Sequence, residues 1–436
     1  MNKFMKSAVV NPSKFPFFYG YVIAFVGTIG VWASFPGQTV GVSVFTDPVK
    51  EALGLSRNQF SNAYLVGTFL SALLIGKSGR LLDVLGTRLV TFLSCLLLGS
   101  ALLLASVSVE ISSFFERIFS VESWMVPFTV ISCLFFLIRF SGQGLLTMAS
   151  RNMIMIWFDK NRGKINSFTS ISLSLGFSLA PLLINVLIDD GGWEHAWRLL
   201  ALGIFVFSIF VWIFYRDKPE DHGLLPDGVS ALVVGNNKEG KSVDLSFTVA
   251  EATRTRSFWM YAFILAFNAF IVTGFSFHIV SIFGTIDIDK TAAVAVFFPI
   301  SIVSVVVSLV FNVLSDYIKL QWQLYGMIFA GILASLGLLY LSEPFGMYLL
   351  IVGVGALGGF FAVLNAIVWP RFYGRKYLGA ITGKVMSFII VSSAIAPSLF
   401  SFFFSYFGSY KYIGIVCLVF LAFLLIGSRK AVIPRV

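Results

Sequence analysis

The feature that most constrains this chain is a series of apolar runs of about 20 residues, the length that an α-helix needs to cross a bilayer. Hydrophobic residues make up 58% of the 436 residues and charged residues only 12%, whereas a soluble protein carries about 25% charged residues. The sequence therefore predicts an all-α membrane protein with twelve transmembrane helices, embedded in a lipid bilayer. The predicted spans cover residues 17–45, 60–78, 88–108, 125–150, 165–188, 196–215, 258–284, 291–315, 321–341, 346–369, 378–405 and 410–428.

The positions of the positive charges predict the orientation of the chain. A net charge of +10 would also fit a nucleic-acid-binding protein, but such a protein needs a soluble domain with a basic face. With the N-terminus inside, 23 Lys and Arg residues fall in the inner segments, which include residues 151–165, and only 6 fall in the outer loops. Positive residues accumulate in the cytoplasmic loops of membrane proteins. We therefore expect both termini in the cytoplasm, a place in the inner or plasma membrane, and no nucleic acid partner.

A long polar stretch divides the chain into two parts of similar size. It occupies residues 216–257, between the sixth and seventh predicted spans, and has the turn residues and charge of a linker. We expect an N-terminal six-helix half at 1–215, a cytoplasmic linker loop, and a C-terminal six-helix half at 258–436. Transporters are often built from duplicated six-helix units, with the substrate bound between them.

The two halves share a weak internal repeat. Gly163 is matched by Gly379, 216 positions later, and Asp83 and Asp316 each follow the second span of their half. The first half carries about 21 extra residues, which we place in the outer loop 109–124. The sequence leaves the role of that loop open.

The densest polar motif lies between the second and third spans. Asp83 is expected to cap the helix that follows it, because a carboxylate there accepts backbone N–H groups and favours the helix dipole. Gly79 and Gly86 permit close helix approach and a tight turn, and Arg80 and Arg88 offer charge partners. Such a cluster can latch the inner ends of two helices and release them during a conformational change. The alternative is an ordinary positively charged loop with a helix cap. The motif reads Gly79-Arg80-Leu81-Leu82-Asp83-Val84-Leu85-Gly86-Thr87-Arg88.

At this motif the chain resembles the major facilitator superfamily, whose signature Gly-x-x-x-Asp-(Arg/Lys)-x-Gly-x-(Arg/Lys) falls in the same loop. Gly79, Asp83, Gly86 and Arg88 match the signature, and Val84 departs from the usual basic residue. The resemblance extends over essentially the whole chain in span count, central loop and repeat. It implies the major facilitator fold, with two pseudo-symmetric six-helix bundles, and transport by alternating access.

Six shorter stretches resemble the oxalate:formate antiporter and monocarboxylate porter-like branch, and imply a monocarboxylate-like substrate. That branch carries a basic residue on its eighth span, where this chain has none before Lys319. The anion-binding residues of the branch therefore do not transfer, and this chain would hold an anion differently. The stretches are 18–21, 37–45, 55–57, 139–144, 219–228 and 369–375.

The titratable residues inside the predicted spans indicate the charge of the substrate. All Asp and Glu residues fall in loops or at helix ends, whereas Arg139, Lys384 and His278 lie within spans. Ionisable residues in a bilayer face a cavity or a neighbouring helix and mark transport paths. Fixed positive charge without a carboxylate favours a small organic anion as the substrate.

Four polar side chains are candidates for direct contact with such an anion. Arg139 can bind a carboxylate through two nitrogens, with Gln143 one turn later on the same helix face. The alternative for Arg139 is a brace to backbone carbonyls of another helix, and its position resembles that of the fourth-helix Arg that the superfamily links to coupling or structure. Gln38 on the first span can reach a ligand or another helix, and Asn365 on the tenth span is a similar single polar group.

Two further candidates have an equally open choice of role. Lys384 lies about six residues inside its span, so its long stem can extend to the membrane interface or its amine can face the cavity. His278 is the one side chain within a span that ordinarily changes charge near neutral pH. It is either a proton carrier or a hydrogen-bonding residue packed between helices.

Together these residues predict a secondary transporter for a small, monocarboxylate-like organic anion, working by proton symport or by facilitated exchange. The substrate is expected between the halves, near the six candidate residues. The alternatives are a non-transporting membrane sensor or partner protein on a transporter scaffold, and a carrier of another small solute. An enzyme would need a buried nucleophile–base pair or a metal cluster. With three His in total, we expect no catalysis, no metal and no cofactor.

Overall fold

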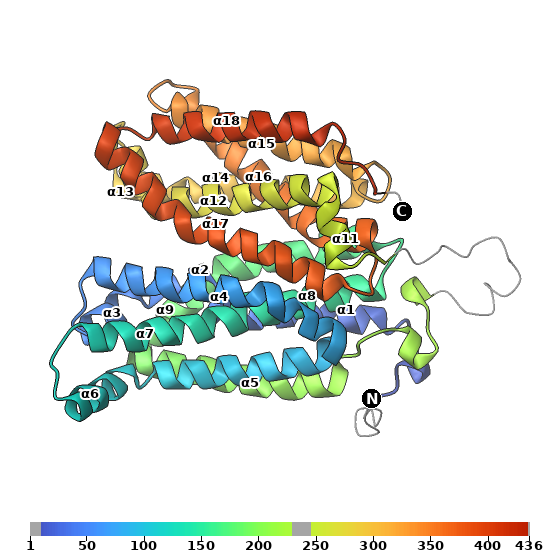
Figure 1. Cartoon of the computed structure of the whole chain (residues 1–436), viewed down its shortest axis with the longest axis horizontal. Coiled ribbons are helices and arrows are strands. Elements are labelled where there is room, and N and C mark those ends of the chain that lie inside the picture. The colour runs from blue at the N-terminus through green and yellow to red at the C-terminus, as the bar shows by residue number, and fades with distance from the viewer. Residues whose placement is uncertain (1–9, 229–245, 435–436) are drawn as a thin grey trace, which may run out of the picture. The chain divides into compact units, whose positions relative to one another are not determined.

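The computed structural model describes residues 10–228 and 246–434, which form helices and connecting loops without a β-strand in those ranges (Figure 1). Within them, ten helices are long and apolar enough to cross a membrane, and Gly20–Ala33 is a shorter apolar helix. The ten are Asn58–Leu85, Thr87–Ala105, Met125–Trp157, Leu183–Phe214, Arg256–Gly284, Phe297–Leu314, Leu320–Leu339, Gly346–Tyr373, Leu378–Phe407 and Lys411–Ser428.

Helical structure lies over each of the twelve intervals that the sequence marks as spans. The first interval is broken into α1 (Gly20–Ala33), the 3-10 turn η3 (Phe35–Gly37) and α2 (Thr39–Val44), because proline and glycine at 36 and 37 interrupt a regular helix. The fifth and sixth intervals share α9 (Arg162–Phe214), which reverses at Gly192, where φ is +83°. The number of true spans stays a prediction.

The remaining helices follow the sequence intervals closely. In the predicted outer loop 109–124, α6 (Ser108–Phe119) forms and packs on α7. The other elements are α3 (Thr46–Ala52), α4 (Arg57–Leu85), α5 (Thr87–Ala105), α7 (Met125–Ile138), η4 (Arg139–Leu146), α8 (Thr147–Trp157), α11 (Val249–Arg254), α12 (Arg256–Gly284), α13 (Lys290–Ala295), α14 (Phe297–Leu314), α15 (Leu320–Leu339), α16 (Gly346–Tyr373), α17 (Leu378–Phe407) and α18 (Lys411–Ser428), with short turns η2 (Pro12–Lys14), η5 (Glu220–His222) and η6 (Pro226–Gly228).

The chain forms two compact units, and each contains a short segment from the far side of the linker. Unit 1 comprises Met1–Asp159, Leu175–Val243 and Leu378–Ser387, so it includes the first turns of α17. Unit 2 comprises Lys160–Ser174, Asp244–Tyr377 and Phe388–Val436, so it includes the first turns of α9. The division into halves at 1–215 and 258–436 stays a prediction about membrane topology.

Each unit is a bundle of helices packed side by side. In unit 1, α4 packs on α7 and η4, and α1 packs on α8. In unit 2, α16 packs on α14 and α15, and α15 packs on α18 (Figure 1). Large apolar side chains such as Phe25, Phe298 and Val419 remain 60% exposed or more, which is the surface expected of helices that face lipid rather than water.

Candidate functional site

A π-helix carries the central arginine of unit 1. The fourth predicted span runs as α-helix through α7, widens into η4 from Arg139 to Leu146, and resumes as α8. A π-turn is a rare local widening that often occurs at functional sites. The sequence prediction of a uniform α-helix at Arg139 and Gln143 is therefore replaced by a π-turn that begins at the arginine itself.

Arg139 is fully buried, at 0% exposure, and only part of its hydrogen-bonding capacity is used. Its Nη1 donates to the carbonyl oxygen of Gly37 at 3.0 Å, and its guanidinium lies 5.1 Å from the centre of the Tyr64 ring. Its Nε and Nη2 are buried without a partner in the described chain. The bond to Gly37 is the backbone brace that the sequence offered as an alternative, while the two remaining donors stay available to an acceptor.

The predicted candidates Gln38 and Gln143 lie next to this arginine in unit 1. Gln38 Nε2 donates to Thr147 Oγ1 at 2.9 Å and to Ser34 Oγ at 3.2 Å, so its amide joins the broken first helix to α8. Gln143 Oε1 is buried without a partner in the described residues. The sequence therefore identified three residues that the fold brings together, although Gln38 is already engaged within the protein.

Arg151 is a second intramembrane arginine that the sequence analysis missed, because it was counted with the inner segment 151–165. The apolar helix continues to Trp157, so Arg151 lies six residues inside the end of its span. Its side chain is partly exposed, its Nε is buried without a partner, and the described residues give its guanidinium no hydrogen bond or ion pair. The apolar run from Met153 to Trp157 was the feature of the sequence that could have placed it.

Asp83 binds a different helix from the one that the sequence predicted. Its Oδ1 accepts the N–H of Gly379 and its Oδ2 accepts the N–H of Ala380, both at 2.8 Å, at the start of α17. The residue that precedes α17, Tyr377, makes no capping bond of its own. The expected cap on α5 is wrong because α4 continues to Leu85, which leaves Asp83 inside its last turn.

The glycines of the motif set the geometry of this contact. A β-carbon at Gly79 would lie 2.2 Å from the carbonyl oxygen of Gly379, so only glycine lets α4 and α17 approach this closely. Gly86 has φ of +87°, a left-handed conformation that ends α4 and starts α5. The motif thus joins α4 to the first turns of α17 within unit 1.

Asp217 takes over the cap on α5, and Arg88 is engaged at the same place. Asp217 Oδ1 accepts the N–H of Arg88 at 2.8 Å and the hydroxyl of Thr87 at 3.0 Å. The Arg88 guanidinium donates to the carbonyl oxygen of Trp212 and lies 4.5 Å from the centre of its ring. Arg88 therefore fastens the end of α9 to α5, rather than acting as the charge partner of Asp83.

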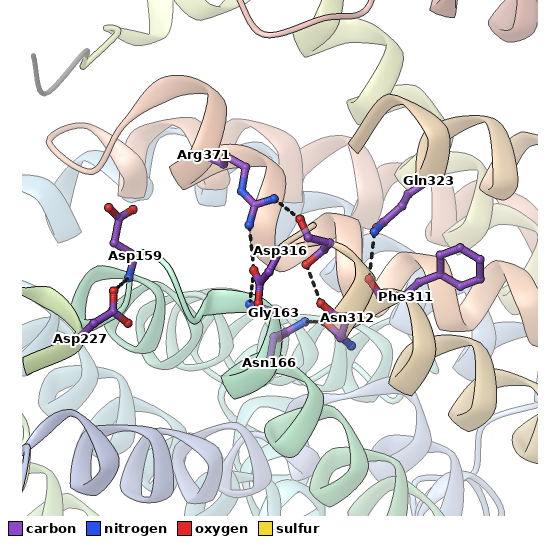
Figure 2. A network of polar contacts seen from close by, with 10 residues as sticks. Asp159, Gly163, Asn166, Asp227, Phe311, Asn312, Asp316, Gln323 and Arg371 are labelled. Carbon is purple, nitrogen blue, oxygen red and sulfur yellow. Dashed lines mark hydrogen bonds and ion pairs between the residues drawn. The ribbon is translucent and has the colours of Figure 1, made fainter. Parts of the chain in front are cut away.

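Unit 2 holds a related network around Asp316 (Figure 2). Asp316 Oδ1 accepts the N–H of Gly163 at 3.2 Å, in the first turn of α9, and forms an ion pair of 3.1 Å with Arg371 Nη2. Asn166 Nδ2 donates to Asn312 Oδ1 at 2.6 Å and to the carbonyl oxygen of Ala362 at 3.0 Å. The two glycines that the sequence repeat aligned, at 163 and 379, thus both meet an aspartate that follows the second span of the opposite half.

His278 lies between α12 and α17 in unit 2. Its Nε2 is 2.9 Å from the carbonyl oxygen of Pro397, so this nitrogen carries a proton and donates it. Its Nδ1 is 3.4 Å from the Tyr410 hydroxyl, which itself donates to Ser281 Oγ at 2.8 Å. The second ring nitrogen, Nδ1, therefore faces a hydroxyl group rather than an ionised side chain.

The remaining candidates lie on α16 and α17. Asn365 on α16 is partly buried, and the described chain provides no hydrogen-bond partner for its amide. Asn268 on α12, which the sequence analysis did not single out, has a buried Oδ1 without a partner in those residues. Lys384 is exposed on the segment of α17 that belongs to unit 1, and its choice between interface and cavity stays open.

Several solved membrane transporters have the same fold. The proton:xylose symporter XylE, bound to 6-bromo-6-deoxy-D-glucose, aligns with a TM-score of 0.67 at 13% identity over 94% of both chains. A bacterial homologue of the iron transporter ferroportin, outward-facing with soaked iron, gives 0.68 at 14% identity over 94% of this chain and 98% of the other. The E. coli fucose:proton symporter FucP gives 0.59 at 12% identity over 94% and 98%. At such identities the likeness shows the fold alone.

The sequence itself identifies the family. No curated protein matches this chain at a significant level. The family model of the Major Facilitator Superfamily matches residues 17–368, which is most of the chain. Since that match agrees with the helical fold and with the motif at Gly79, the chain is a multi-pass membrane protein that belongs to the Major Facilitator Superfamily of transporters.

Proposed function

We propose that this protein is a secondary active transporter that moves a small, monocarboxylate-like organic anion across the cell membrane by alternating access. Twelve spans with both termini in the cytoplasm are part of the proposal, supported by the charge distribution of the loops. The six stretches that resemble the oxalate:formate and monocarboxylate branch support the substrate class.

The observation that carries the proposal is the state of Arg139. A guanidinium that is removed from water costs several kcal/mol unless its donors and its charge are satisfied. Arg139 has one carbonyl acceptor and one aromatic ring, but two buried donors without a partner. A carboxylate is the ligand whose charge and two oxygens complement such a group.

The similar solved structures are named for other substrates. The buried arginine, Arg139, is the reason to propose an organic anion instead. The names of the similar structures refer to xylose, fucose and iron. A neutral sugar could use the unpaired amide oxygen of Gln143, but it would not neutralise the arginine. Proton coupling, which those names also mention for xylose and fucose, is proposed here through His278.

Uptake into proteoliposomes tests the proposal. Wild-type protein is expected to exchange labelled lactate, pyruvate or oxalate against the unlabelled acid. Arg139→Gln should reduce that exchange by roughly 10- to 100-fold, because a hydrogen bond to a charged group contributes about 1.5–3 kcal/mol.

The matched control is Arg117→Gln, which removes an exposed guanidinium from α6 and should exchange anions as the wild type does. Size-exclusion profiles of both variants establish that each is folded. Transport of xylose or fucose without transport of any organic acid would overturn the substrate class, and unchanged exchange by Arg139→Gln would remove the arginine from the path.

A further inference from the structure

The second intramembrane arginine, Arg151, has features of a binding residue rather than of a structural one. A structural arginine in a membrane protein is normally paired or braced to backbone carbonyls. In the described chain Arg139 has such a brace, whereas the guanidinium of Arg151 has neither a hydrogen bond nor an ion pair. Arg151 is also partly exposed while Arg139 is fully buried. Part of the Arg151 side chain is therefore open to its surroundings, unlike that of Arg139.

The π-turn places the two arginines on one face of their helix. In a regular α-helix, residues twelve apart differ by about 120° around the axis, because each residue turns the chain by about 100°. A π-turn takes up one additional residue. Arg139 and Arg151 therefore have the relative orientation of two residues eleven apart in a regular α-helix. Such residues differ by only about 20° around the helix axis. Their separation along the axis is about 16.5 Å, too long for one small anion to bridge.

The contacts of Arg139 and of Thr147, which lies between the two arginines, agree with this alignment on one helix face. Arg139 donates to the carbonyl oxygen of Gly37, and Thr147, one turn before Arg151, bonds Ser34 Oγ at 2.9 Å and accepts from Gln38. All of these partners come from η3 and the two residues that flank it, Ser34 and Gln38. One polar stripe thus runs along unit 1 from Arg139 through Thr147 to Arg151, with a cation at each end.

We propose that Arg151 is a second anion-binding residue of the transport path, which binds the carboxylate of the transported organic anion at the Trp157 end of the fourth predicted span. Because the two arginines are too far apart to share one small anion, the carboxylate engages Arg151 and Arg139 in succession. The π-turn is what aligns the two positions. This inference rests on the proposed function and extends it from one binding position to two.

Ligand binding to the purified full-length protein tests Arg151 directly. Thermal unfolding in detergent is followed with sodium lactate, pyruvate and oxalate as probes, because a ligand that binds only the folded state raises the melting temperature. For each acid that the wild type binds, Arg151→Gln should bind roughly 10- to 100-fold more weakly. Arg151→Lys keeps the charge but loses the planar fork, so it should lie between the two. Arg117→Gln should bind as the wild type does.

A chemical rescue separates charge from packing. In a Cys133→Ser parent, whose remaining cysteines 95 and 417 are buried, Arg151→Cys should lose binding. Reaction with 2-aminoethyl methanethiosulfonate restores a positive charge and should restore binding, whereas 2-sulfonatoethyl methanethiosulfonate should not. Equal rescue by both reagents, or wild-type affinity in both Arg151→Gln and Arg151→Lys, would overturn the role of Arg151 alone. If the wild type binds none of the acids, the proposed function fails together with this inference.

Discussion

At the scale of single residues, Arg139 makes the backbone brace that the sequence offered as one alternative and keeps buried donors for the anion proposed as the other. One nitrogen braces the fourth span to Gly37, and two others stay buried without an acceptor. The brace fixes the position of the side chain, so the remaining donors are held in place before a ligand arrives. Pre-organised donors bind an anion more strongly than mobile ones, since less conformational entropy is lost on binding.

His278 is the residue at which proton coupling can be tested. We predict that wild-type uptake of the anion rises when an inward proton gradient is imposed. Protonation of Nδ1 gives His278 a positive charge, and the Tyr410 oxygen can accept a hydrogen bond from the new N–H group. His278→Gln keeps a donor for the carbonyl oxygen of Pro397 but cannot take up a proton. Its uptake should be independent of the gradient, as measured in proteoliposomes at fixed internal pH.

The matched control for His278 is His195, an exposed residue in the part of α9 that follows Gly192. Replacement of His195 by Gln should leave the pH profile of uptake unchanged. A wild-type profile in His278→Gln would exclude His278 as the carrier. Because a tyrosine hydroxyl ordinarily loses its proton only at about pH 10, Tyr410 cannot produce the same dependence.

The sequence could predict that ionisable residues lie within apolar helices, but not what they contact. Arg139 and His278 follow from their positions within apolar runs. The partner of Arg139 depends on how η3 packs on η4, and no local pattern around either segment encodes that register. Arg151 was missed for a related reason: a single arginine near the end of an apolar run looks the same whether the helix stops there or continues.

At the scale of elements, three helices begin with a cap that comes from a distant aspartate. Asp217 caps α5, Asp83 caps α17 and Asp316 bonds the first turn of α9. The sequence indicated that Asp83 caps the next helix in the chain, α5, but in the structure it caps α17. Asp83 lies in the last turn of α4, where its charge opposes the helix dipole, so the N-terminus of α17 provides a more favourable partner.

The contact between Asp83 and α17 can be measured as protection of backbone amides. Removal of a cap destabilises a helix end by about 0.5–2 kcal/mol. We predict that Asp83→Ala increases hydrogen exchange of the amides in Leu378–Ser387 by roughly 2- to 30-fold. Gly79→Val should do the same, since its side chain would collide with the carbonyl oxygen of Gly379. Mass spectrometry of peptides from α17 gives both values.

A matched variant in unit 2 provides the control for this measurement. Asp316→Ala removes the acceptor of Gly163 and the partner of Arg371, so exchange should rise at Lys160–Ser174 and not at Leu378–Ser387. Unchanged exchange in both Asp83→Ala and Gly79→Val would show that the contact does not hold α17. Increased exchange over the whole of unit 1 would indicate general unfolding rather than a released latch.

At the scale of the whole molecule, the two aspartate contacts constrain any alternating-access cycle. Each compact unit contains the first turns of a helix whose remaining part belongs to the other unit. A movement of one half against the other therefore has to release Asp83 from α17 and Asp316 from α9. The two contacts differ in strength, because Asp316 also forms an ion pair with Arg371. We expect the contact of Asp83 to open first.

The orientation in the membrane is the remaining prediction at this scale, and single cysteines test it. In the Cys133→Ser parent, cysteine is placed at the exposed positions Ser120, Asp221 or Lys430. Three predicted spans separate Ser120 from Asp221, and six separate Asp221 from Lys430. With positive residues inside, an impermeant maleimide should label Ser120→Cys in intact cells, but Asp221→Cys and Lys430→Cys only after permeabilisation. Labelling of Asp221→Cys and Lys430→Cys in intact cells would place both termini outside. Labelling of only one of the two would require an odd number of spans in the C-terminal half.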